Sequence, residues 1–243
     1  MYNYIIKELL DRLDISTELS GIIHYGSSNL GISDDFSDID ILIVIESEYM
    51  NLRSRGKFII KEKEVEYFIK TENDIYKELL EEKNNMEPVL LTTLLNGTII
   101  IDKYKCLEKL KQRAIEVEKM PYAGLSKEEI TLKMINLYNE LKEIKRKFYK
   151  GCKDFRFSYD NYLYEIIEFC YKYNKIPIRK YKLYNALYNE HFAKLNLFSD
   201  IQDLYLKNEI KYLIEAIDIH RLEKVVAYLA EKVGFIEEYR IFY

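Results

Sequence analysis

The stretch that decides the fold reads His24-Tyr25-Gly26-Ser27-Ser28-Asn29-Leu30-Gly31, then Ile32-Ser33-Asp34-Asp35-Phe36-Ser37, then Asp38-Ile39-Asp40-Ile41-Leu42-Ile43-Val44-Ile45. A Gly-Ser pair ends one short apolar run, and about ten residues later two aspartates open another. Asp38 and Asp40 stand at positions i and i+2, so on a strand their side chains share one face. Two neighbouring carboxylates repel each other unless a cation lies between them. The stretch therefore predicts a metal site at the start of a buried strand.

The Gly26-Ser27 pair has the chemistry of a phosphate contact. Glycine lets the backbone turn and approach a phosphate without a Cβ clash. A small turn that runs into a helix also offers free backbone N–H groups to phosphate oxygens. Ser27 can add its hydroxyl to a phosphate or can cap the helix, and Ser37 can touch phosphate or cap the turn before Asp38. With the two aspartates, this turn predicts a site for a metal-bound nucleoside triphosphate.

A third carboxylate is expected on a neighbouring strand, and residues 63–69 offer two. Glu66 lies between apolar Val65 and Tyr67, where the strand enters the core, and a buried acid there needs a metal or a proton. Glu64 lies next to a charged turn and is expected in solvent. We therefore favour Glu66, either as a metal ligand or as the base that takes a proton from the acceptor.

The composition is that of an ordinary globular protein. The chain has 243 residues, 48% of them hydrophobic and 32% charged, and no apolar run approaches the roughly 18 residues of a membrane span. Its charged start is unlike a signal peptide. Three scattered cysteines without a CxxC pattern favour reduced thiols, and the three isolated histidines are assigned no chemistry. We expect a cytoplasmic protein with no membrane contact.

Charge is distributed unevenly along the chain. The net charge of −4 argues against nucleic acid as the main partner. Residues 1–121 carry about 16 basic and 23 acidic side chains, and residues 122–243 about 21 and 18. The basic half can help to hold a triphosphate; the alternative is a fluctuation between two solvated surfaces.

The first half of the chain alternates helical and strand patterns. Helical spacing covers residues 2–14, 73–83, 89–95 and 106–117, and strand-like runs cover residues 21–25, 39–45, 58–60, 65–69 and 98–101. The run at 39–45 is apolar almost throughout, which is typical of a strand covered on both faces. Residues 55–57 and 61–64 are interpreted as breaks between strands. The pattern predicts an α/β domain with a small mixed sheet.

The second half reads as helices. Residues 120–124, Met-Pro-Tyr-Ala-Gly, form the best linker, and a capping box from Ser126 to Glu129 opens a helix that continues to residue 148. Further helical patterns cover residues 159–173, 181–187, 203–217 and 222–233, and no convincing strand lies among them. We therefore predict an α+β fold, with an α/β domain over residues 1–121 and an all-α helical bundle over residues 122–243.

The Gly-Ser turn and the three carboxylates together resemble the motifs of a known family. Gly26-Ser27, Asp38-Ile39-Asp40 in an apolar strand and Glu66 in a second strand resemble the DNA polymerase β-type nucleotidyltransferase superfamily. A small α/β domain with a helical partner is similar to the bacterial aminoglycoside and lincosamide nucleotidyltransferases. The specific part covers roughly residues 22–69. Glutamate in place of the commoner aspartate as third carboxylate is a departure that the antibiotic-modifying branch tolerates.

The resemblance implies a reaction and its cofactors. It implies transfer of a nucleoside monophosphate from an NTP, with ATP as the expected donor, to a hydroxyl of a small molecule such as an antibiotic, with release of pyrophosphate. Two Mg²⁺ ions would be held by Asp38, Asp40 and Glu66, and the triphosphate would be contacted by Gly26, Ser27 and Ser37. The helical domain would bind the acceptor. Dimers occur in these families, which makes a homodimer an expectation as well.

The helical half leaves several roles open. Glu165 and Glu168 lie on a strongly aromatic helix and can bind a cationic acceptor, or they are exposed acids beside core aromatics. Lys180 and Lys182 can reach the triphosphate, or they belong to a solvated basic turn. Two other functions stay open as well. One is nucleotidylation of a protein or tRNA, which predicts a contiguous basic surface if the partner is RNA. The other is nucleotide binding without catalysis, against which the three intact carboxylates argue.

Overall fold

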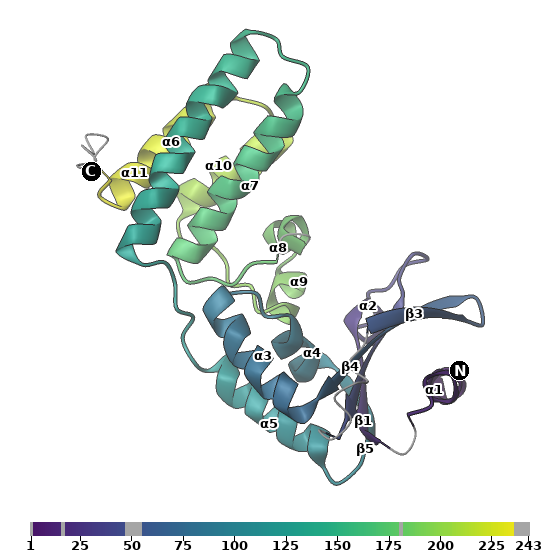
Figure 1. Ribbon diagram of the computed structural model, residues 1–243. Helices are drawn as coiled ribbons and strands as arrows, with labels where there is room; N and C mark the ends of the chain where they lie inside the picture. Colours follow the sequence, from purple (N-terminus) through teal and green to yellow (C-terminus); the bar gives the residue numbers. More distant parts are fainter. Residues whose placement is uncertain (1, 16–17, 47–54, 180–181, 236–243) are drawn as a thin grey trace. The chain divides into compact units, whose positions relative to one another are not determined.

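The computed structural model describes residues 2–15, 18–46, 55–179 and 182–235. The chain divides into two compact units, residues 1–121 and residues 122–243, and the division falls within the segment 120–124. Figure 1 shows a sheet with helices in the first unit and helices in the second.

The first unit is built on a five-stranded mixed sheet with the order β3-β4-β2-β1-β5 (Figure 1). The strands are β1 (Leu19–Tyr25), β2 (Ile39–Ile45), β3 (Arg55–Ile60), β4 (Lys63–Thr71) and β5 (Thr98–Asp102). Only the β2–β4 pair of this sheet is parallel, and the other neighbours are antiparallel. The predicted small mixed sheet is confirmed.

Helices cover both faces of this sheet. One face is covered by α1 (Tyr2–Leu13), whose Ile5 and Leu9 pack in one core with Ile41 and Ile43 of β2. The other face contacts α3 (Glu72–Asn85), α4 (Val89–Asn96) and α5 (Cys106–Glu118). Leu42, which alternates with Ile41 and Ile43, is equally buried there. The expectation that β2 is covered on both faces is confirmed.

The interpretation of residues 55–57 as a break between strands is wrong, because they form the first half of β3. An edge strand tolerates charged residues on an open face, and here Lys57 forms an ion pair with Glu64 of β4. Gly56 pairs with Tyr67 in the β3–β4 ladder, and the Tyr67 side chain occupies the space that a Cβ at residue 56 would need. A Cβ at Gly56 would stand 2.5 Å from the Tyr67 hydroxyl oxygen.

A buried carboxylate from α3 caps the N-terminus of α4. Glu82 accepts hydrogen bonds from the backbone N–H groups of Leu90 and Leu91, the second at 2.8 Å. The N-cap residue itself is Pro88, which makes no side-chain cap. Burial raises the pKa of Glu82 to about 7, although the two N–H donors oppose the rise.

This carboxyl gives the first unit a pH-dependent stability. Between the ordinary pKa of 4.5 and the folded value of about 7, the folded state binds more protons than the unfolded state, so stability falls as pH rises. We expect the unfolding free energy of the wild type to fall by roughly 3 kcal/mol relative to Glu82→Gln across this window. Urea denaturation at several pH values measures it, with Glu81→Gln as the exposed control. Parallel profiles of wild type and Glu82→Gln would contradict the prediction.

The second unit contains only helices within its described residues, which confirms the predicted helical C-terminal part. They are α6 (Lys127–Tyr149), α7 (Phe155–Tyr173), α8 (Leu183–Tyr188), α9 (Glu190–Leu195), α10 (Leu204–Glu215) and α11 (Ile219–Lys232). The predicted capping box is present, because Ser126 and Glu129 each accept from the other's backbone N–H. The short helix α9 is not predicted from the sequence; it begins at a cap from Asn189.

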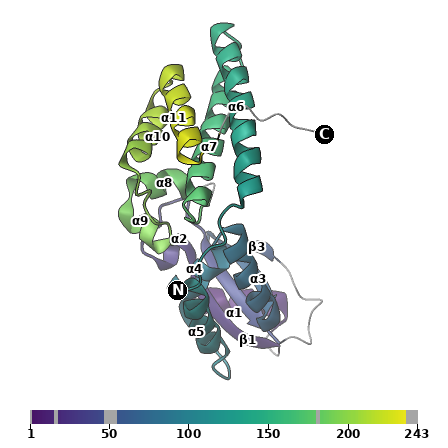
Figure 2. The same ribbon diagram turned by 90° about the vertical axis from the view of Figure 1, so that its left-hand side faces the viewer.

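Two buried tyrosines form hydrogen bonds between these helices. Helices α6 and α7 lie side by side, and α10 and α11 pack against them (Figures 1 and 2). The hydroxyl of Tyr159 in α7 donates to the carbonyl of Leu213 in α10 at 3.2 Å, and that of Tyr162 donates to Leu137 in α6 at 2.7 Å. Across the described ranges, every helix is too short or too polar to cross a membrane.

Candidate metal centre

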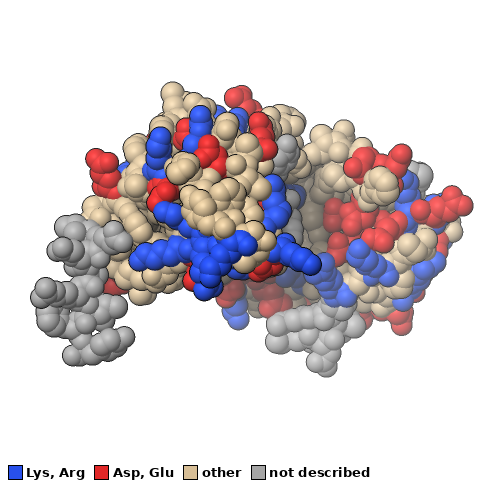
Figure 3. Space-filling view, turned by 90° about the horizontal axis from the view of Figure 1, so that it is seen from above, with Lys and Arg blue, Asp and Glu red and all other residues tan. Residues whose placement is uncertain are grey.

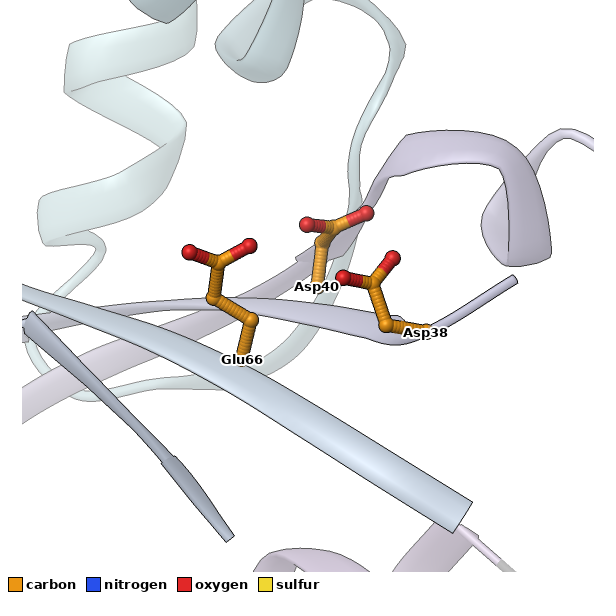
Figure 4. A group of neighbouring side chains, drawn as sticks. All are labelled: Asp38, Asp40 and Glu66. Carbon is orange, nitrogen blue, oxygen red and sulfur yellow. The ribbon is translucent and has the colours of Figure 1, made fainter. Parts of the chain in front are cut away.

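Three carboxylates meet where the parallel strands β2 and β4 lie next to each other. The register places Asp40 directly opposite Glu66, and Asp38 precedes Asp40 by two residues on the same side. One carboxylate oxygen from each of the three residues lies within 4.8 Å of the others. Figure 4 shows the three side chains extending from the two strands to the same side. The structure thus brings together the three acids that the sequence singles out.

The burial of these acids makes their mutual repulsion costly. Glu66 is only 9% exposed, and Asp38 and Asp40 are half-buried. Carboxylates at this distance in a partly buried site favour a nearby cation, since an opposite charge offsets both repulsion and desolvation. Three carboxylates also supply the hard oxygen ligands that Mg²⁺ prefers. The donor set therefore fits a divalent metal.

An arginine of β3 already supplies one positive charge. The Arg55 guanidinium donates to Oε1 of Glu66 through Nε at 2.9 Å and through Nη2 at 2.6 Å. Its carbon Cζ lies 4.9 Å from the centre of the Phe68 ring, so the side chain is held between an acid and an aromatic face. The sequence does not identify this residue, because Arg55 next to Gly56 has the composition of a turn.

Gly26 is required at its position by the geometry of Asp40. The glycine adopts φ +77°, a conformation that other residues rarely adopt. A Cβ at Gly26 would stand 1.8 Å from Oδ2 of Asp40. The turn and the second aspartate are therefore in direct contact, and no other residue type fits at residue 26 without displacing that carboxylate.

Tyr25 is a further residue of this site that the sequence does not single out. It pairs with Asp40 across the β1–β2 ladder. Burial raises the pKa of the Tyr25 hydroxyl, and the charges of Asp40, Glu66 and Asp38 raise it further. Tyr25 therefore stays protonated beside the three carboxylates.

Ser27 lies within a single helical turn and is not its cap. Helix α2 spans Gly26–Asn29, and its N-cap is Tyr25, so the alternative that Ser27 caps a helix is wrong. The next serine has a partner from β1, since the Ser28 hydroxyl oxygen lies 2.9 Å from Nε2 of His24. Burial lowers the pKa of His24, which favours a neutral ring. This histidine anchors the turn.

The hydroxyl of Ser37 points to the loop before β2. It donates to Oδ1 of Asp34 at 2.8 Å and accepts from the Asp34 N–H at 2.9 Å. The same carboxylate accepts from the N–H of Phe36 at 3.0 Å. The hydrogen bond from Ser37 is the main reason that the pKa of Asp34 is lowered. This geometry favours a role for Ser37 in holding the turn that presents Asp38.

In the helical unit, the two glutamates that the sequence proposes for an acceptor are engaged in ion pairs. Lys133 of α6 lies 3.1 Å from the carboxylate of Glu165 and 3.7 Å from that of Glu168. Lys172 adds a second pair to Glu168 at 2.9 Å. These contacts fit a role in joining α6 to α7, and a role in binding an acceptor stays a prediction.

Two basic residues near residue 180 have partners within the second unit. Arg179 and Lys182 both approach Oδ1 of Asn196, at 3.5 and 3.3 Å. Lys182 also lies 5.7 Å from the ring centre of Phe192. Lys180, the other lysine proposed for triphosphate contact, lies outside the described residues.

Comparisons with known proteins give distant similarities. No protein-family model and no curated protein sequence matches the chain. A nucleotidyltransferase-like protein from Exiguobacterium sibiricum aligns with a TM-score of 0.47 and 13% identity, over 94% of this chain and 73% of that one. Spectinomycin adenyltransferase AAD(9) from Enterococcus faecialis, solved with ATP and spectinomycin, aligns with a TM-score of 0.33 and 14% identity, over 96% and 99%. Both scores are too low to carry a functional argument.

Proposed function

We propose that the first unit catalyses nucleotidyl transfer. A nucleoside monophosphate would move from a Mg²⁺-bound NTP, with ATP as donor, to a hydroxyl of a small molecule such as an antibiotic, and pyrophosphate would leave. The observation that carries this proposal is the junction of Asp38, Asp40 and Glu66 within 4.8 Å, with the Gly26 turn packed against Asp40.

The metal would be held by the three carboxylates. The three acids and Arg55 carry a net charge of −2, which one Mg²⁺ would balance, and the bound triphosphate would add the negative charge that a second Mg²⁺ would balance. When bound, the ions neutralise charge on the phosphate oxygens and lower the barrier to attack by the acceptor oxygen. The chain itself contributes the fixed spacing of the carboxylates on two hydrogen-bonded strands, which orients them before the substrate arrives.

The bonds that form and break in nucleotidyl transfer suggest roles for the other residues around the site. The acceptor oxygen forms a bond to the α-phosphorus, the bond from the α-phosphorus to the leaving pyrophosphate breaks, and the acceptor gives up its proton. Glu66 either completes the ligand set or takes this proton. Gly26 and Ser27 are the proposed phosphate contacts, through backbone N–H groups and a hydroxyl. Arg55 donates to Glu66 and would add a positive charge near the phosphates of a bound nucleotide.

Pyrophosphate release is the direct test of this function. The protein is incubated with Mg²⁺ and each of the four NTPs, with and without pooled aminoglycosides and lincosamides. We expect release that depends on Mg²⁺ and on an acceptor. Release that needs a protein or RNA in place of the antibiotics would move the acceptor to a macromolecule. A folded protein that shows no binding of Mg²⁺–NTP by calorimetry would contradict the proposal.

Glu66 and Glu64 form a matched pair for testing the third carboxylate. They lie two residues apart on β4, but Glu66 joins the aspartates and Glu64 forms an ion pair with Lys57. We expect Glu66→Gln to lower the rate of pyrophosphate release by about 10²–10⁴-fold, the range of general acid–base catalysis. Glu64→Gln should stay within about threefold of wild type, because exposed ion pairs contribute little. The reverse order of effects would mean that a different register forms the site.

A further inference from the structure

The turn that joins α6 to α7 concentrates positive charge. Residues 142–157, called here the α6–α7 tip, contain seven basic and two acidic side chains, which gives a local charge of +5 in a chain of net charge −4. The basic residues are Lys142, Lys145, Arg146, Lys147, Lys150, Lys153 and Arg156. Figure 3, which views the molecule from above, shows lysine and arginine side chains gathered on that face. Such a patch attracts a polyanion.

Part of this charge is unpaired. Four of the basic residues form ion pairs in the unit, namely Lys145 with Glu223, Arg146 with Glu143, Lys147 with Asp154 and Arg156 with Asp160. Lys142, Lys150 and Lys153 are exposed and form no ion pair with any described residue. The three lysines are therefore available to anionic groups of a partner.

Aromatic rings stand exposed among these charges. Phe157 is 74% exposed and Tyr149 is 65% exposed. Phe148 lies between Tyr149 and Phe155, with ring centres 5.3 Å apart on each side, so the cluster is held in place. Exposed rings next to lysines are the combination that binds single-stranded nucleic acid, in which bases stack on the rings and phosphates meet the cations.

A groove opens beside one of these rings, Phe157. It lies between α6 and α7 and has a volume of about 320 Å³. Lys147 and Phe157 line it together with three acidic residues, Glu140, Glu143 and Glu165. Ser158 and Asn161 line it further along α7. A hydroxyl and an amide can hydrogen-bond to base edges, whereas the three carboxylates repel phosphates. The groove therefore suits a base at most, and the phosphates are assigned to the exposed lysines of the α6–α7 tip.

We propose that the α6–α7 tip binds single-stranded nucleic acid, with Lys150 and Lys153 on phosphates and Tyr149 and Phe157 stacked on bases. Unpaired bases are needed because a duplex hides its ring faces. A lipid surface, which also attracts exposed phenylalanines and lysines, is the competing partner, and the vesicle titration below distinguishes it. The net charge of −4 argues against a nucleic-acid partner only as an average over the whole chain, in which the acidic first unit outweighs the basic tip. The proposal is independent of nucleotidyl transfer.

Fluorescence anisotropy with labelled oligonucleotides tests the charge component. Mixed-sequence RNA and DNA of about 12 nucleotides are titrated between about 0.05 and 0.3 M NaCl. We expect Lys150→Gln/Lys153→Gln to weaken binding at least about tenfold at low salt and to lower the salt slope by roughly 1.4, about 0.7 for each lost phosphate contact on a single strand. Lys77→Gln/Lys109→Gln, which removes two exposed lysines from α3 and α5 of the other unit, should bind as wild type. Equal loss in both double variants would overturn the proposal.

A ring variant and two other ligands test the stacking component. Phe157→Ala should weaken oligonucleotide binding at least about fivefold but leave binding of inorganic polyphosphate unchanged. Tighter binding of RNA than of DNA would identify the 2′-hydroxyl as a contact. Equal binding would mean that the tip contacts only the bases and phosphates, which RNA and DNA share. Binding of phosphatidylserine vesicles without binding of either oligonucleotide would overturn the proposal. Asp40→Asn should bind oligonucleotides as wild type, which separates failure here from failure of the catalytic proposal.

Discussion

Asp40→Asn is expected to lower the rate of pyrophosphate release by at least about 10³-fold, the kinetic equivalent of losing roughly 4 kcal/mol of charge stabilisation. Asparagine keeps the shape of the side chain that packs on Gly26 and faces Glu66. It removes the charge that a cation needs, and it also removes one repulsive partner from the carboxylate group. Thermal denaturation should therefore show a folded protein that is at least as stable as wild type without added metal.

The matched control for this substitution is Asp35→Asn. Asp35 is exposed in the loop before β2 and is not one of the three gathered carboxylates. Both substitutions change the net charge by the same amount, and the two positions lie five residues apart. They differ in that Asp40 belongs to the carboxylate group and Asp35 does not. Calorimetric titration with Mg²⁺ should show loss of binding in Asp40→Asn and not in Asp35→Asn. Equal activity in the two variants would remove Asp40 from the metal centre.

Gly26→Ala is expected to abolish transfer and to destabilise the first unit by about 1–3 kcal/mol. The strain at φ +77° contributes to the loss of stability, and the new Cβ would stand 1.8 Å from Oδ2 of Asp40. Because that oxygen must move, the spacing of the three carboxylates changes together with the turn. The effect on catalysis should therefore be far larger than the stability loss alone explains.

Gly31→Ala separates strain from contact. Gly31 has nearly the same backbone angle, φ +69°, but no atom lies within 4 Å of the Cβ that alanine would add. We expect Gly31→Ala to lose less thermal stability than Gly26→Ala, because it carries the strain without the clash, and to release pyrophosphate at a near-normal rate. If Gly31→Ala lost activity to the same degree, backbone strain and not the contact with Asp40 would set the function of this loop.

The sequence predicts the three carboxylates because local patterns define them. Alternation along a strand puts Asp38 and Asp40 on one face, and the apolar neighbours of Glu66 indicate that it enters the core. Arg55 could not be predicted in this way. Its contact with Glu66 depends on β3 being an edge strand in one particular register with β4, which is a property of the assembled sheet. A charge next to a glycine is interpreted as a turn without that information.

In the helical unit, too, local sequence patterns do not show which charges come together in the folded chain. Helical periodicity predicts where α6 and α7 run, and a count of charges gives a second half that is only mildly basic. The sharp turn between Tyr149 and Phe155 brings the basic end of one helix next to the basic start of the other. A local excess of charge therefore arises from the hairpin, and an average over the sequence conceals it.

The parallel pairing of β2 with β4 has a consequence for how the first unit folds. β1 and β2 form one antiparallel pair with the aspartates, and β3 and β4 form another with Glu66. Neither pair by itself holds three ligands, and the acids repel each other where the two pairs join. A divalent ion that binds only at this seam favours the joined sheet by mass action over both separate hairpins. If the three acids hold the proposed ion, its concentration would enter the folding equilibrium of the first unit, and the joined sheet would be least stable when the ion is scarce.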